Sequence, residues 1–168
     1  MDMAAETLVS VEEYLSTSYS PDMEYVDGVL LERNVGEWNH GQVQSNVIFA
    51  LRRKYADIKV IPELRSKVTG TRYRVPDVCV TLRNPHTRVL MEAPYIAIEI
   101  LSEEDRINRL IEKLKEYAAI GTPNIWVFDP RLQQMFTFRS EELQKITGDT
   151  ISTGDPRIEL TRDEVFQD

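Results

Sequence analysis

Two carboxylates stand out in this 168-residue chain because each lies in or beside a strongly apolar segment. Asp77 directly precedes the apolar residues 78–82, and Glu99 lies inside the apolar residues 95–101. Such segments are typical of buried strands, where an ionised carboxylate is costly unless a counter-charge compensates it. The pair therefore needs a chemical explanation rather than a packing one.

The spacing of the two segments predicts that these carboxylates meet. If residues 73–82 and 95–101 pair as an antiparallel hairpin, symmetric about the loop at 83–94, the neighbourhood of Asp77 comes opposite that of Glu99. Two close carboxylates raise each other's pKa unless a cation lies between them, and such hard oxygen ligands suit Mg²⁺ or Mn²⁺. Glu63, on the preceding predicted strand, can approach the same point.

A predicted helix at residues 104–120 supplies candidate cations for this site. Its apolar stripe consists of Ile107, Leu110, Ile111, Leu114, Tyr117 and Ala118. At 100° per residue, Arg106, Lys113 and Tyr117 fall along one flank of the stripe, while Lys115 borders the other flank. The helical pattern alone does not choose between the two lysines.

The remaining pattern predicts a single α/β domain over residues 1–168, with a mixed sheet and packed helices. Ser10 and Glu13 form a capping box that opens a short N-terminal helix, and Asp27-Gly28 predicts a hairpin within residues 23–32. A second helix is expected at 40–55. Strands are expected at 58–68, 73–82, 95–101, 124–129, 135–139 and 144–147, before a last helical turn at 161–166. The strand–helix–strand order over 95–129 predicts a parallel crossover.

Composition narrows the class of protein. The formal net charge of −8 argues against nucleic-acid binding through a general basic surface, although a local basic groove beside an acidic metal site is compatible with it. The single Cys79 excludes an intrachain disulfide and suits a reducing compartment. No apolar run approaches the roughly 20 residues of a membrane span, and residues 1–6 lack secretory-signal features, so we expect a cytoplasmic protein without a membrane partner.

Other catalytic chemistries find no support in the sequence. There is no phosphate-binding P-loop, and Cys79 with His40 or His86 has no nucleophile signature. Two histidines and one cysteine are too few for a zinc-finger set. Apart from a divalent metal, no cofactor is expected.

An ordered set of motifs resembles the PD-(D/E)XK nuclease superfamily, and within it the Uma-two family of bacterial restriction-endonuclease-like proteins. The motifs span residues 11–138. They are Glu24-Tyr25-Val26-Asp27-Gly28, His40-Gly41, Pro62-Glu63-Leu64-Arg65, Val75-Pro76-Asp77-Val78, Ile98-Glu99-Ile100-Leu101-Ser102, Glu112-Lys113-Leu114-Lys115-Glu116-Tyr117 and residues 121–130.

The resemblance implies a restriction-endonuclease-like core, with a four-stranded mixed sheet flanked by helices. It also implies that Asp77, Glu99 and the backbone carbonyl of Ile100 bind Mg²⁺ or Mn²⁺. The common superfamily form places a lysine two residues after the glutamate, where this chain has Leu101. In the Uma-two family that lysine is thought to have moved to the following helix, which matches Lys113.

The same resemblance implies a metal-dependent endonuclease that cleaves DNA and acts as a homodimer. Glu24 and Glu63 are candidates for a second metal or for metal-bound waters, and Tyr117 and Arg106 for phosphate contacts. His40 either caps the following helix or contacts phosphate or metal. A different hypothesis is a catalytically inactive nuclease-like fold that serves as a binding or regulatory module, which the net charge of −8 and the displaced lysine favour.

Overall fold

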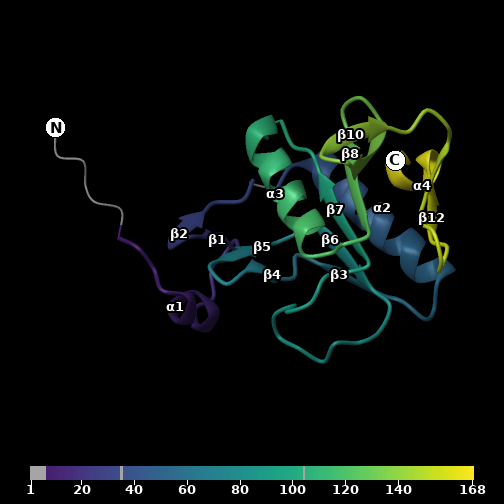
Figure 1. The fold of residues 1–168 in the computed structure, drawn as a ribbon. Helices are drawn as coiled ribbons and strands as arrows, with labels where there is room; N and C mark the ends of the chain where they lie inside the picture. Colours follow the sequence, from purple (N-terminus) through teal and green to yellow (C-terminus); the bar gives the residue numbers. More distant parts are fainter. Residues whose placement is uncertain (1–6, 35, 104) are drawn as a thin grey trace.

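The chain folds around a six-stranded mixed sheet and a smaller four-stranded antiparallel sheet (Figure 1). The computed structural model describes residues 7–34, 36–103 and 105–168. Two sequence-based expectations concern residues outside these ranges: the N-terminal segment 1–6 and the start of a helix at Glu104. Among the described residues, no helix is long and apolar enough to cross a membrane.

The large sheet has the strand order β10-β9-β8-β7-β6-β3. Its central strands β7 (Ile96–Ile100) and β8 (Asn124–Asp129) are parallel and are connected through helix α3 (Ile107–Ala119), as the predicted crossover requires. The mixed sheet flanked by helices is confirmed, but it has six strands rather than four because additional strands pair along it. Its other strands are β3 (Lys59–Pro62), β6 (Val78–Thr81), β9 (Gln134–Arg139) and β10 (Glu142–Lys145).

The small sheet has the order β2-β1-β5-β4 and lies beside α3 (Figure 1). Its strands are β1 (Glu24–Val26), β2 (Val29–Leu31), β4 (Ser66–Thr69) and β5 (Arg72–Arg74). Asp27 and Gly28 form the predicted two-residue turn, with φ of 50° and 94°. Of the predicted capping box at helix α1 (Val11–Ser16), the N-cap half is present, since the Glu13 N–H donates to Ser10 Oγ at 3.1 Å.

Two predicted strands are each divided between the two sheets. Residues 73–82 separate into β5 and β6, because Pro76 has no N–H for strand pairing. Residues 58–68 likewise separate into β3 and β4, with Glu63 in the left-handed region at φ 52° between them. The chain thus passes twice between the sheets, and Asp77 lies at one of these passages.

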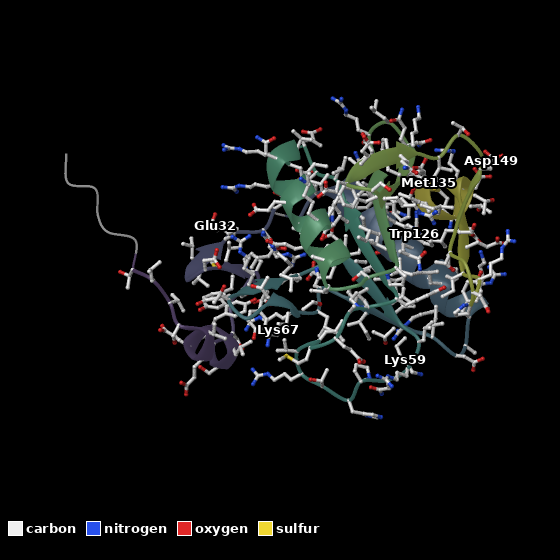
Figure 2. All side chains as sticks on the ribbon, in the orientation of Figure 1. Glu32, Lys59, Lys67, Trp126, Met135 and Asp149 are labelled. Carbon is white, nitrogen blue, oxygen red and sulfur yellow. The ribbon has the colours of Figure 1, made fainter. Side chains whose placement is uncertain are left out.

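Helices cover both faces of the large sheet. Helix α2 (Trp38–Lys54) packs on one face together with α4 (Arg162–Phe166), and α3 covers the other face. A separate two-stranded sheet of β11 (Thr150–Ser152) and β12 (Glu159–Thr161) lies on the α2 side. In β7, Ile96, Ile98 and Ile100 belong to the core on the α2 side, whereas Ala97 belongs to the core under α3. Trp126 and Met135 lie inside the molecule on the α2 side (Figure 2).

This alternation determines the direction of Glu99. Successive side chains of a strand point to opposite faces, so the residue between Ile98 and Ile100 faces α3. One position of β7 therefore directs a carboxylate at the helix that carries the candidate lysines.

Cys79 is fully buried in β6, and burial raises the pKa of its thiol to about 12. Because the thiolate is the reactive species, we expect the native protein to resist labelling by a disulfide reagent at mildly alkaline pH. Full labelling is expected in denaturant, which serves as the control. Rapid stoichiometric labelling of the native protein, measured by absorbance of the released thiol, would contradict the buried position.

Candidate active site

The antiparallel hairpin brings Asp77 and Glu99 together. Val78 pairs with Ile98 in the observed register, so the next position outward places Asp77 beside Glu99. Both are nearly inaccessible, with side-chain exposures of 8% and 6%. The Ile100 N–H donates to Asp77 Oδ2 at 2.7 Å, which fixes one oxygen of the carboxylate against β7.

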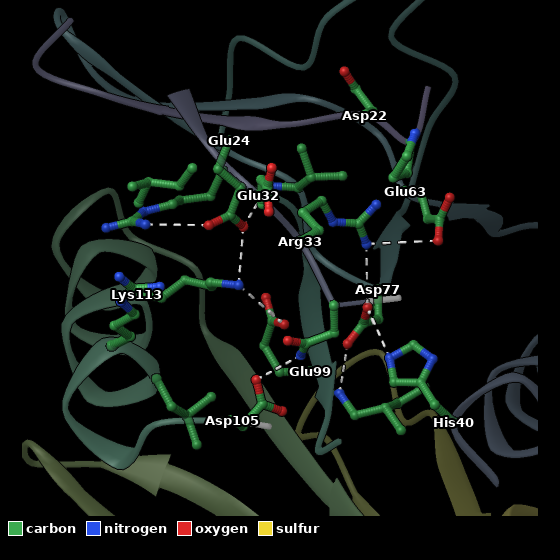
Figure 3. Close-up of a pocket in the computed structure, with 18 of the residues that line it drawn as sticks. Asp22, Glu24, Glu32, Arg33, His40, Glu63, Asp77, Glu99, Asp105 and Lys113 are labelled. Carbon is green, nitrogen blue, oxygen red and sulfur yellow. Dashed lines mark hydrogen bonds and ion pairs between the residues drawn. The ribbon is translucent and has the colours of Figure 1, made fainter. Parts of the chain in front are cut away.

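The other carboxylate oxygen of Asp77, Oδ1, lies beside the side chains of Arg33 and His40. Arg33 Nη2 lies 3.3 Å and His40 Nε2 3.2 Å from Oδ1 (Figure 3). Burial alone would raise the pKa of Asp77, but the hydrogen bonds from His40 and the Ile100 N–H, with the charges of His40 and Lys113, outweigh it and lower the pKa. Asp77 therefore remains ionised at neutral pH.

The pKa of Glu99 is raised, whereas that of Asp77 is lowered. Tyr117 Oη donates to Glu99 Oε1 at 2.7 Å, and Lys113 Nζ lies 3.5 Å from Oε2. Burial raises the pKa of Glu99 to about 8, and the negative charges of Asp77 and Glu24 add to the effect, while Lys113 and Tyr117 offset only part of it. Two adjacent carboxylates with pKa values moved in opposite directions are typical of functional sites.

The structure places Lys113, and not Lys115, at this site. Lys113 projects from α3 toward the carboxylates with 17% side-chain exposure (Figure 3), whereas Lys115 is exposed to solvent. Burial would lower the pKa of Lys113, but the charges of Glu24, Glu99 and Asp77 raise it, so the amine is protonated. Leu101, at the position where the common pattern has lysine, packs against the core under α3.

Four of the five predicted accessory residues line one cavity of about 680 Å³, and the fifth, Tyr117, does not line it. His40 contacts Asp77, and Tyr117 contacts Glu99. Glu63 is half exposed and lies 3.5 Å from Arg33 rather than against the carboxylate pair. Arg106 lines the cavity just before α3. Glu24 lies against Lys113 at 2.9 Å.

Arg33 is the residue that the sequence did not reveal. It lies in the segment between β2 and α2, and its guanidinium bridges Asp77 and Glu63 at 3.3 and 3.5 Å. This segment has no helical or strand pattern in the sequence, so nothing distinguished Arg33 from the other cationic residues as part of the site. Its side chain is only 13% exposed.

The donor set fits a hard divalent cation with few protein ligands. The Ile100 N–H points toward Asp77, and the N–H and C=O of one strand residue face the same edge, so the Ile100 carbonyl is directed to the same side. Two carboxylates and one carbonyl suit Mg²⁺ or Mn²⁺, which keep several waters. In the described part of the chain, no group of three or more His, Cys, Asp or Glu side chains is arranged to hold a metal.

Comparison with known proteins agrees with this fold. A family model described as "Uma2: Putative restriction endonuclease" matches residues 11–163. A crystal structure described as "a putative nuclease belonging to DUF820" from Anabaena variabilis ATCC 29413 has a TM-score of 0.77 at 20% identity, covering 94% of this chain and 97% of that one. No curated protein matches the chain.

A second solved structure, described as a "DrdV-DNA complex", has a TM-score of 0.42 at 16% identity, with 61% of this chain covered and 9% of that one. The similarity to the Anabaena variabilis structure, at a TM-score of 0.77, is what shows the fold, which is of the restriction-endonuclease-like class. Because the family model covers most of its length, the chain belongs to the Uma2 family of restriction-endonuclease-like proteins.

The burial of Glu99 leads to a prediction on stability. The pKa of Glu99 is about 8 in the folded state and near 4.5 in the unfolded chain. Its contribution to the free energy of unfolding is therefore fully present below about pH 4.5 and is lost as the pH rises through about 8. Glu99→Gln removes the ionisable group, so we expect it to raise the melting temperature in chelator more at about pH 9 than at about pH 6. Glu32→Gln, at an exposed position of the same cavity, is the control and should change little. An equal effect of Glu99→Gln at both pH values would contradict the raised pKa.

Proposed function

We propose that this protein is a divalent-metal-dependent endonuclease that hydrolyses phosphodiester bonds of DNA. The observation that carries the proposal is the buried pair of Asp77 and Glu99, opposite each other and facing Lys113 in one cavity. Membership of the Uma2 family supports it. We further propose Mg²⁺ or Mn²⁺ as the metal, a cytoplasmic location, and a homodimer as the form that cuts both strands.

Each residue then has a distinct role. Asp77, Glu99 and the Ile100 carbonyl bind the metal, which when bound promotes ionisation of a water molecule and offsets negative charge on the phosphate. Lys113, held near Glu99, orients the attacking water or stabilises charge that develops in the transition state. Tyr117 holds Glu99 in place through its hydrogen bond.

The cations on the Asp77 side fit the same reaction. Arg33 and His40 point at Asp77 from different segments, and Arg106 lines the same cavity. Arginine suits phosphate recognition because its planar guanidinium can donate two parallel hydrogen bonds. Together with Lys113 they provide local positive charge in a protein whose net charge is −8.

The direct test is cleavage of plasmid DNA with Mg²⁺ or Mn²⁺. We expect the wild type to nick or linearise the plasmid, and Asp77→Asn and Lys113→Met to lower the rate by at least about 100-fold, because each removes a group needed for metal or charge stabilisation. Glu32→Gln serves as the matched cavity control and should retain activity. Equal background from wild type and Asp77→Asn would refute the enzymatic proposal.

One observation favours the alternative of a binding or regulatory module. Both carboxylates already have cationic or hydrogen-bonding partners within the protein: Arg33 and His40 at Asp77, and Lys113 and Tyr117 at Glu99. In that case the pair would be a structural ion cluster, and no metal need bind.

Substitution of Arg33 separates the two functions. If a metal binds Asp77, Arg33 competes with it, so Arg33→Met should tighten Mn²⁺ binding by about threefold or more, measured by titration calorimetry. Arg83→Met, an exposed arginine paired with Glu92 away from the cavity, is the control. Absence of Mn²⁺ binding to both wild type and Arg33→Met would favour the non-catalytic module.

A further inference from the structure

Four charged side chains between α3 and the small sheet are joined by three contacts into a ring that only the backbone of α3 closes. Lys113 Nζ lies 2.9 Å from Glu24 Oε1, Glu24 Oε2 lies 3.2 Å from Arg74 Nη1, and Arg74 Nε lies 2.6 Å from Glu116 Oε2. Glu116 follows Lys113 by three residues on α3. The ring therefore begins and ends on one helix and passes through β1 and β5.

Glu24 is fully engaged within this ring. Besides its two cationic partners, Oε1 accepts the Val75 N–H at 3.1 Å. Burial alone would raise the pKa of Glu24, but Lys113, Arg74 and the Val75 N–H outweigh it and lower the pKa. Its side chain is 7% exposed and that of Arg74 is 3% exposed. Such a carboxylate has little capacity left for a second metal, one of the two roles suggested for Glu24 above; the other was hydrogen bonding to metal-bound waters.

Arg74 holds its place through a two-point contact. Its Nε and Nη2 donate to the two oxygens of Glu116 at 2.6 and 3.1 Å, a geometry that the single ammonium of lysine does not reproduce. The third contact, from Nη1, goes to Glu24. Arg74 thus couples the orientation of Glu24 to that of α3.

We propose that Glu24 and Arg74 are positioning residues for Lys113. The Lys113 ammonium is closer to Glu24 than to Glu99, at 2.9 against 3.5 Å, so Glu24 keeps the amine beside Glu99 without a tight pair forming there. Lysine has a long flexible stem, and without this tether the amine would turn away from Glu99 toward solvent. This inference rests on the proposed nuclease function.

A double-mutant cycle in catalysis tests the proposal. Glu24→Gln should lower kcat by about 10-fold or more at saturating Mg²⁺, with KM for DNA within about twofold, because only the placement of the amine changes. In a Lys113→Met background, Glu24→Gln should cause no further loss. An equal loss in both backgrounds would overturn the proposal, since Glu24 would then act without Lys113.

Arg72 provides a matched control for Arg74. It also contacts Glu116, at 2.6 Å, but its other carboxylate partners are Asp27 and Glu112. Arg74→Lys should reduce kcat, while Arg72→Lys should leave it unchanged. A comparable loss in both variants would mean that anchoring of α3 in general, and not the position of Lys113, is responsible. Should Arg74→Lys fail to fold, as judged by circular dichroism, the Glu24–Lys113 cycle still decides.

Two measurements that need no catalysis distinguish this inference from the proposed function. Glu24→Gln should leave the Kd for Mn²⁺ within about threefold, whereas loss of a metal ligand would weaken binding by 10-fold or more. Urea midpoints in chelator should be non-additive for Glu24→Gln and Lys113→Met, because the two groups contact each other. If the wild type does not cleave DNA, the nuclease function fails, and additive midpoints would overturn the tether itself.

Discussion

The structure depends on one unfavourable arrangement, the placement of two carboxylates side by side at the end of a buried hairpin. Burial of ionised groups is tolerated only when charges and hydrogen bonds compensate it. Asp77 receives this compensation from Arg33, His40 and a backbone N–H, and Glu99 receives it from Lys113 and Tyr117. The surrounding elements α2, α3 and the small sheet are positioned so that they can deliver these groups.

The compensation divides into two halves with different chemistry. On the Asp77 side, His40 of α2 and Arg33 of the preceding segment contact the carboxylate, and the hydrogen bonds from His40 and the Ile100 N–H lower its pKa despite burial. On the Glu99 side, one lysine serves two carboxylates and leaves the pKa of Glu99 at about 8. Because the pKa of Asp77 is lowered and that of Glu99 is raised, the pair is not a symmetric ion cluster. A bound cation would therefore change the ionisation of the two carboxylates differently.

Much of this arrangement could be predicted from sequence because it follows from strand periodicity. The hairpin brings the neighbourhoods of Asp77 and Glu99 together, and side-chain alternation along β7 directs Glu99 toward α3. The exact pairing of Val78 with Ile98 is one residue away from symmetry about the loop, so the sequence did not predict it. The helical pattern left Lys113 and Lys115 equivalent, since both border the apolar stripe, and resemblance to a family was needed to choose. The position of Arg33 and the ring through Arg74 could not be foreseen, because they join segments whose relative placement is set only by the two divided strands.

The passage of the chain from β5 to β6 at Pro76 has a consequence for synthesis of the protein. The acidic pair is completed only when β7 follows, and its lysine only when α3 follows. A chain emerging from the ribosome up to residue 100 carries both carboxylates but neither Lys113 nor Tyr117. Such a chain lacks the groups that compensate Glu99, and the α3 residues that cover this face of β7 are also missing. The order of the residues along the chain thus delays assembly of the candidate site until α3 has docked.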